Sequence, residues 1–282
     1  MVFIKKYFMG NICQINSSSS LVVLIDQSRP TLYSLLKILE TNSKVLGVVC
    51  CNKQGIKNRL EIEKRTIKKY GLLPRISQIL LSIYFYIIER NTTSSLEKKM
   101  YPMINFSRLK NILENRNIPL IETDNYESMT VLNFINSIEP DFLVAHTPYW
   151  VGKKIRAASK SKLVVGSHPG LVPYYRGAHS AFWCVFDSNM DLNGYSIFLL
   201  DSGIDSGPIL FQKKIKYDQK ISYKENELTL MKLISEKQSE LVSCLSKGEG
   251  ISLIHQNGLS DDQVKKAPGI FTYFKFMYKT LK

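Results

Sequence analysis

The chain has 282 residues, 38 Lys and Arg against 24 Asp and Glu, and a hydrophobic fraction of 44%. That length suits one large α/β domain with a small extension, and that composition excludes a disordered, collagen-like or disulfide-scaffold protein. Five Cys with no CxxC motif argue against a structural zinc site, so no metal is predicted, and they favour a reducing, cytoplasmic compartment.

The net charge of +14 comes largely from Lys in a background rich in Asn and Ile, and composition explains most of it. Residues 53–75 are the exception, because eight basic residues there meet only two Glu. Such a patch suits a polyanion or an anionic membrane surface, although no nucleic-acid partner is expected. Its basic members are Lys53, Lys57, Arg59, Lys64, Arg65, Lys68, Lys69 and Arg75.

Residues 1–19 are predicted to be an N-terminal extension, and they lack the apolar run and cleavage site of a signal peptide. Residues 76–88 form the longest apolar run, which is too short to cross a bilayer as a helix of about 20 residues. A buried helix is the favoured interpretation. The alternative is a membrane-surface helix, which would bring residues 53–88 into peripheral contact with the inner face of the membrane.

The first elements in chain order form a βαβ unit. Residues 21–25 read as a buried strand, Ser28 and Pro30 begin a helix with Leu at helical spacing, and residues 44–50 read as a second strand. A parallel sheet follows from this order. Residues 26–29 stand where a glycine-rich phosphate loop would lie, so the dinucleotide-binding motif is absent.

Alternating strands and helices continue after a predicted helical insertion at about 53–103, which ends in a polar connector at 90–99. The expected strands are 118–121, 142–145 and 163–166, and the expected helices are 106–115, 128–137 and 152–159. A hairpin of 195–200 with 209–215 and a helix at 224–246 follow, whereas the tail from 251 has few signals. We therefore predict an α/β fold with a mostly parallel sheet, a main domain at 20–220, and a C-terminal helix and tail at 221–282.

The strongest chemical signal lies after the strand at 163–166. His168 follows that strand and enters a loop constrained by Pro and Gly. About 30 residues later, residues 201–208 contain two Asp and two Gly, and such a turn can bring a carboxylate back beside His168. A His held by a carboxylate is a general acid or base whose pKa can lie near neutrality.

These residues resemble a known family. HPGLVPYYRG at 168–177 followed by DSGIDSGPIL at 201–210 resembles the formyltransferases that use 10-formyltetrahydrofolate, which act on glycinamide ribonucleotide, methionyl-tRNA and nucleotide-linked amino sugars. The resemblance is specific over 163–215 and weaker over 21–151. It implies a Rossmann-like sheet, a folate pocket, and transfer of a formyl group to an amine.

The resemblance also implies the catalytic residues. His168 and Asp205 take the positions of the family's His and Asp, whereas Gly166 takes the position of its Asn. The amide of that Asn donates a hydrogen bond to the formyl oxygen, and loss of such a donor costs about 2.7–4 kcal/mol. Either Ser167, His179 or a backbone N–H replaces it, or the chain is a weak or inactive homologue.

Binding residues follow from the same comparison. Residues 145–151 lie where the family's pterin-contacting strand end lies, and Tyr149 and Trp150 are either stacking groups or ordinary core and rim aromatics. Arg176 is either structural or faces an anionic substrate. The predicted donor-binding residues are Ala145, His146, Thr147, Tyr149 and Trp150, and the predicted substrate-binding residues are Arg176 and His179.

The acceptor is predicted to be a nucleotide-linked amino sugar of surface-polysaccharide biosynthesis. GAHSAFW at 177–183 resembles the sugar-modifying branch, and the 67 residues after Ile215 leave little chain for the C-terminal barrel of methionyl-tRNA enzymes. The alternatives are a formyltransferase for methionyl-tRNA or for another small amine or hydroxylamine of siderophore type, and a non-catalytic folate- or sugar-binding homologue. The sequence does not indicate an oligomeric state.

Overall fold

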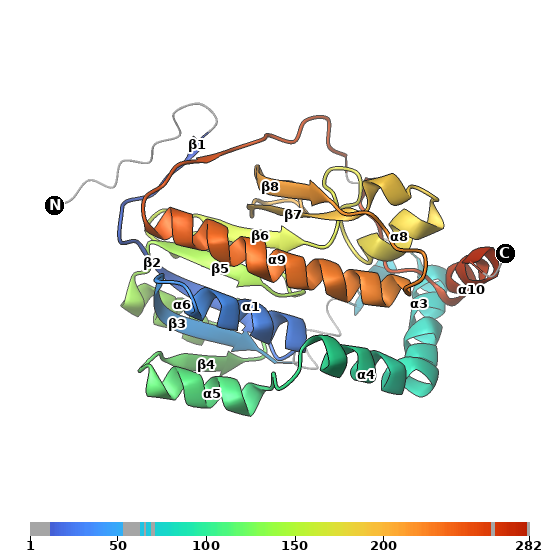
Figure 1. The fold of residues 1–282 in the computed structure, drawn as a ribbon, viewed down its shortest axis with the longest axis horizontal. Coiled ribbons are helices and arrows are strands. Elements are labelled where there is room, and N and C mark those ends of the chain that lie inside the picture. The colour runs from blue at the N-terminus through green and yellow to red at the C-terminus, as the bar shows by residue number, and fades with distance from the viewer. Residues whose placement is uncertain (1–11, 53–62, 65, 69–70, 261–262, 281–282) are drawn as a thin grey trace.

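A sheet in the strand order β4–β3–β2–β5–β6–β7–β8 forms the centre of the structure (Figure 1). The computed structural model describes residues 12–52, 63–64, 66–68, 71–260 and 263–280. The strands of this sheet are β2 (Ser20–Asp26), β3 (Lys44–Cys51), β4 (Leu120–Thr123), β5 (Phe142–His146), β6 (Val164–His168), β7 (Gly194–Leu199) and β8 (Ile209–Lys214).

Strands β2 to β6 pair in parallel, whereas β7 pairs antiparallel with both β6 and β8. The predicted mostly parallel sheet is therefore confirmed, and so is the fold class. The central strands are buried along their whole length, as expected for parallel strands that are covered on both faces.

Helices cover both faces of the sheet. Helices α1 (Arg29–Leu39), α5 (Phe106–Asn115) and α9 (Tyr223–Ser246) share one apolar cluster, and α6 (Met129–Ile138) and α7 (Lys153–Arg156) share another on the opposite face. Figure 1 shows α1 and α9 side by side across the near face. The predicted helix boundaries are close to these, except that α7 is shorter than the expected 152–159.

Helix α9 lies beyond the predicted domain boundary at residue 220 but packs on the main sheet. Its Ile234 and Leu230 are fully buried and belong to the same cluster as Val23 of β2 and Val165 of β6. Helix α9 therefore completes the core to which β2 belongs.

The insertion differs from the prediction in two ways. It contains α3 (Leu72–Tyr84), a π-helix η1 (Phe85–Glu89) and α4 (Arg90–Met100), so the connector expected at 90–99 is helical. The favoured buried helix at 76–88 is also wrong, because Leu81 is the buried residue of α3 while Ile76, Ile83 and Ile87 are exposed. Periodicity could not reveal this, since α3 is apolar on both its inner and its outer face.

Part of the predicted basic patch lies outside the described residues, as do residues 1–11 of the extension. Among its members that the structure describes, Lys64 and Lys68 are exposed and Arg75 forms an ion pair with Glu63. The members outside are Lys53, Lys57, Arg59, Arg65 and Lys69.

The tail carries structure that the sequence signals did not predict. Strand β9 (Ile251–Ser252) pairs antiparallel with β1 (Ile12–Cys13), and α10 (Ile270–Thr280) packs against α3. A third apolar cluster joins α10 to α8 (Ser180–Phe186) and α9, with Phe182 at its centre. A short 3-10 helix η2 (Met190–Leu192) leads into β7.

In the part of the chain that the structure describes, no single helix is both long and apolar enough to span a membrane. The segments Leu72–Ile88 and Asn91–Met100 together reach that length and composition, but they are bent by 71° relative to each other.

The packing of α9 predicts that Ile234→Ala lowers the free energy of unfolding of the whole protein by about 3 kcal/mol, because it leaves a cavity in the core. Urea unfolding, followed by circular dichroism and by intrinsic fluorescence, measures this. Glu240→Ala on the exposed side of α9 is the control and should change stability by less than about 0.5 kcal/mol. A separate early transition for α9 in the Ile234 variant would contradict a shared core.

Candidate functional site

His168 is the last residue of β6, and its ring is held from one side. Its Nε2 lies 2.8 Å from the backbone carbonyl of Tyr175, so this nitrogen carries the proton and donates it to that carbonyl. In the neutral ring, Nδ1 therefore keeps the lone pair. Nδ1 lies 3.6 Å from Oδ2 of Asp205, and both side chains are largely buried.

Asp205 reaches His168 through a loop that runs back along β6. The loop leaves β7 beside the start of β6, where the Leu200 amide donates to the Val164 carbonyl. His168 lies at the other end of β6, about 13 Å away at the usual rise per residue in a strand. The turn at 201–208 was expected to return a carboxylate to His168, and this path does so.

A tight turn holds Asp205 in position. The Asp201 carboxylate accepts hydrogen bonds from the Gly203 amide at 2.9 Å and the Ser206 hydroxyl at 2.6 Å. Asp205 itself has a left-handed backbone with φ of 48°, a conformation that a non-glycine residue adopts only when its surroundings impose it. A Cβ at Gly207 would overlap the Leu199 carbonyl, so only glycine fits the end of the turn.

The loop after His168 meets this turn. The Gly177 amide donates to Oδ2 of Asp205 at 2.7 Å, and the buried Arg176 donates through Nε to the Ile204 carbonyl at 2.8 Å. Arg176 therefore ties the two loops together, which favours the structural one of its two predicted roles. His179 is exposed at the start of α8.

The space beside Gly166 is filled by Leu200. Gly166 and His168 share one face of β6, and a Cβ at Gly166 would overlap the end of the Leu200 side chain. Ser167 lies on the other face, where its Oγ is 3.4 Å from Nδ1 of His146. Ser167 is thus a wrong candidate for the missing Asn, because alternation along the strand turns it away from His168.

The predicted donor-binding segment is divided between core and surface. Ala145 and His146 are buried, and Nδ1 of His146 lies 3.0 Å from Oε1 of Gln238 on α9. Thr147 and Tyr149 are half-buried, and the Tyr149 amide donates to the Thr147 hydroxyl. Trp150 is 53% exposed.

The ring of Trp150 has a cation beside it, because the Arg156 guanidinium lies 5.5 Å from its centre. Trp150 is therefore exposed with a cation over its ring, while the His146 side chain is turned toward α9.

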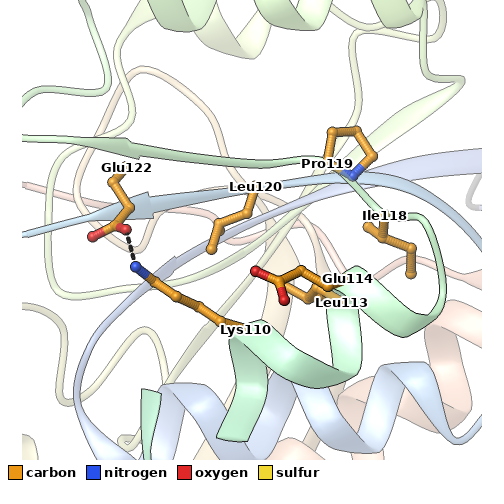
Figure 2. Close-up of a pocket in the computed structure, with 7 residues that line it drawn as sticks. All are labelled: Lys110, Leu113, Glu114, Ile118, Pro119, Leu120 and Glu122. Atoms are coloured by element: carbon orange, nitrogen blue, oxygen red, sulfur yellow. Dashed lines mark ion pairs between the residues drawn. The ribbon is translucent and has the colours of Figure 1, made fainter. Parts of the chain in front are cut away.

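A hollow of about 350 Å³ lies at the far edge of the sheet (Figure 2). Figure 2 shows the Lys110–Glu122 ion pair across it, with Leu120 of β4 and Leu113 of α5 in its wall. Three strands, β3, β2 and β5, separate β4 from β6 in the sheet, so this hollow is distinct from the His168 site.

The five Cys are all free, and they do not contribute a thiolate to the site. Burial raises the pKa of Cys50 and of Cys184 to about 12, which keeps both protonated at neutral pH. Among the described residues, no group of three or more His, Cys, Asp or Glu is arranged to hold a metal ion.

The sequence did not predict several groups that position His168 and Asp205. The Tyr175 carbonyl and the Gly177 amide position His168 and Asp205, but backbone groups leave no residue-type signal. Gln256 donates to the Asp205 and Gly207 carbonyls from a tail that had few signals. Leu200 could be found only from the fold, since its contact with Gly166 depends on the path of the loop.

Comparison with known proteins agrees with this geometry. Residues 122–243, which include His168 and Asp205, match the family model described as formyl transferase. This segment is similar to the formyltransferases. The formyltransferase match covers β5, β6, β7 and β8, which carry the site.

Two curated formyltransferases are similar over part of the chain. Methionyl-tRNA formyltransferase from Thermotoga maritima is 28% identical over 141 residues, which cover 50% of this chain and 44% of that protein. GDP-perosamine N-formyltransferase from Brucella melitensis is 28% identical over 113 residues, which cover 39% and 42%. The chain thus spans less than half the length of these relatives.

The fold of a solved formyltransferase is similar over most of the chain. The crystal structure of a 4-N formyltransferase from Francisella tularensis has a TM-score of 0.52 and 13% identity, and the match covers 93% of this chain and 89% of that one. At this identity the comparison supports the fold alone.

The Leu200 contact predicts that Gly166→Ala lowers the free energy of unfolding by about 1–3 kcal/mol, because the new Cβ forces Leu200 to move. In the Gly166→Ala/Leu200→Ala double variant the two effects should not add, with a coupling of at least about 0.5 kcal/mol in a double-mutant cycle. Chemical denaturation of the four proteins measures this. Additive losses would mean that Leu200 does not occupy the place of a side chain at Gly166.

The buried His146 predicts a sensitivity to acid. Burial lowers its pKa below the ordinary value of 6.5, although Gln238 and Asp26 oppose that shift. Since the unfolded chain takes up this proton first, His146 lowers the stability as the pH falls below about 6.5, by at most about 1.4 kcal/mol per pH unit. Melting temperatures between about pH 7.5 and 5.5 should fall less for His146→Gln than for the native chain. Parallel curves for the two proteins would remove His146 as the cause.

Proposed function

We propose that this chain is an N-formyltransferase that transfers the formyl group of 10-formyltetrahydrofolate to the amine of a nucleotide-linked amino sugar. The observation that carries the proposal is the pair of His168 Nδ1 and Asp205 within the segment that matches the formyl transferase family model. We further propose a cytoplasmic reaction that serves surface-polysaccharide biosynthesis, since a reducing compartment suits five free Cys.

The orientation of His168 suits it to act as a base. With Nε2–H donated to the Tyr175 carbonyl, the Nδ1 lone pair is available to take a proton from the acceptor amine. The resulting imidazolium would lie between that carbonyl and the Asp205 carboxylate, and both partners stabilise a positive ring. Asp205 keeps this position because the Gly177 amide holds its Oδ2.

The formyl group itself would come from the bound 10-formyltetrahydrofolate. In support of a donor site beside β6, Thr147, Tyr149 and Trp150 follow β5, and Trp150 presents an exposed ring that suits stacking on a flat heterocycle. Gly166 has no side-chain amide to offer to the formyl oxygen, and Leu200 lies where such a side chain would be. Protonated His168 and backbone N–H groups remain as hydrogen-bond donors.

The acceptor is the part of the proposal that most needs testing. The GDP-perosamine enzyme is a relative named for a sugar nucleotide, and a net charge of +14 suits a phosphate-bearing acceptor. Methionyl-tRNA is the second candidate, and the longer match to a methionyl-tRNA formyltransferase supports it. Another small amine or hydroxylamine is the remaining enzymatic alternative.

A non-catalytic folate- or sugar-binding role is the candidate from a different class. The apolar Leu200 beside Gly166 supports it, because a formyl oxygen would meet a methyl group there and not an amide. Against it stand the buried His168–Asp205 pair and the left-handed Asp205.

We predict that His168→Ala and Asp205→Asn each lower the turnover of formyl transfer at least about 100-fold, because each removes part of the proton-accepting pair. Release of tetrahydrofolate in the presence of 10-formyltetrahydrofolate and a panel of nucleotide-linked amino sugars measures this. His255, an exposed residue of the tail, provides the matched control, and His255→Ala should keep native turnover. Native turnover in both folded site variants would refute the assignment.

The acceptor panel also separates the alternatives. It should include initiator methionyl-tRNA and small hydroxylamines beside the sugar nucleotides. The proposal predicts the highest kcat/KM with a sugar nucleotide. Turnover with methionyl-tRNA alone would identify methionyl-tRNA as the acceptor in place of a sugar nucleotide. Folate binding without turnover of any amine would support the non-catalytic role.

A further inference from the structure

The outer faces of α3, η1 and α10 are apolar and exposed, although the same helices pack on the protein through their inner faces. Leu73 is 80% exposed, Ile87 68% and Phe271 76%. On the inner side, Leu81 of α3 and Phe276 of α10 are buried in the cluster around Phe182. Each helix therefore has one apolar face that is buried and a second apolar face that is exposed.

The exposed side chains are ordered as a stripe. Leu73, Ile76, Leu80, Ile83 and Ile87 follow one another at intervals of three and four residues, which places them on one side of the helical segment. Residues 271, 274 and 278 of α10 have the same spacing and are also exposed.

The two stripes belong to neighbouring helices. The ring of Tyr84 lies 5.7 Å from that of Phe274, and the ring of Phe85 lies 5.0 Å from that of Tyr273. Figure 1 shows α3 and α10 at one end of the molecule beside α8. We call the exposed apolar residues of 72–88 and 270–280 the α3–α10 surface.

The charge of this surface has one sign. Within residues 72–88 the one charged residue is Arg75, which pairs with Glu63. Residues 270–280 contain two Lys and no acidic residue. Lys275 and Lys279 on α10 are exposed, and so are Lys64 and Lys68 before α3.

We propose that the α3–α10 surface docks on an anionic membrane surface. Apolar stripes bordered by Lys, with Tyr86 and Tyr278 among the exposed residues, are typical of helices that lie in the plane of the interface. Anionic headgroups complement the Lys residues. A second copy of the chain would instead bring two basic surfaces together, which like-charge repulsion opposes.

Docking would orient the His168 site. The segment before α10 runs past that site, where Lys265 accepts a hydrogen bond from the Ala178 amide and its own amide donates to the Arg176 carbonyl. The next two residues accept hydrogen bonds from α8 and α3. Trp183 Nε1 of α8 donates to the Lys266 carbonyl, and Gln78 Nε2 of α3 donates to the Ala267 carbonyl. One segment of chain thus joins the α3–α10 surface to the loop that carries Gly177.

Sedimentation with vesicles tests the proposal, and the readout does not depend on formyl transfer. The full chain is mixed with vesicles of phosphatidylcholine alone or with about 30% phosphatidylglycerol, at about 0.05 M and about 0.5 M salt. We expect binding to the anionic vesicles at low salt, weaker binding at high salt, and little binding to phosphatidylcholine alone. No binding to anionic vesicles at low salt overturns the proposal.

Leu73→Ser/Phe271→Ser should weaken binding to anionic vesicles at least about tenfold, because two exposed apolar side chains no longer enter the interface. Lys275→Gln should weaken binding at low salt only. The matched control is Met129→Ser, an exposed apolar residue of α6, which should bind as the native chain does. All variants should melt as the native chain does.

Two outcomes count against the membrane. Equal loss of binding in the Met129 control would show that the α3–α10 surface is not the contact. A dimer in light scattering that Leu73→Ser/Phe271→Ser dissociates, without any vesicle binding by the native chain, would assign the surface to a second copy and overturn the proposal.

Discussion

The return of the 200–208 loop along β6 is the constraint on which the site depends. β7 runs antiparallel to β6, so its end lies beside the start of β6 and far from His168. The loop must therefore turn back from that end before Asp205 can face the imidazole. Gly166 permits this path, because a strand residue without a side chain leaves room for Leu200 to lie against β6.

Backbone groups then hold the site in place. The Tyr175 carbonyl sets the tautomer of His168, the Gly177 amide sets the carboxylate of Asp205, and Arg176 holds the second loop by the Ile204 carbonyl. All three belong to the same loop after β6. A single short segment, constrained by Pro and Gly, therefore positions both His168 and Asp205.

The chain also combines a buried core with an exposed apolar surface. The sheet and its helices form an ordinary α/β core, in which α9 covers the strands that carry the site. At the end of the molecule that holds α3 and α10, apolar side chains remain exposed beside Lys. The segment at 265–267 lies between them, bonded to the site loop and to α3 and α8.

The choice of Asp205 over Asp201 as the partner of His168 followed from the resemblance to a family. The sequence by itself determined the sheet and most helix positions. Those features rest on local signals: buried strands read as apolar runs, helices as a repeat of three and four, and tight turns as Gly and Pro at set positions. The outward face of α3, the helix α10 and the Leu200 contact were decided only by tertiary structure. An apolar side chain has the same sequence signature whether its face meets the core or the solvent, and which face is covered depends on segments far away in the chain.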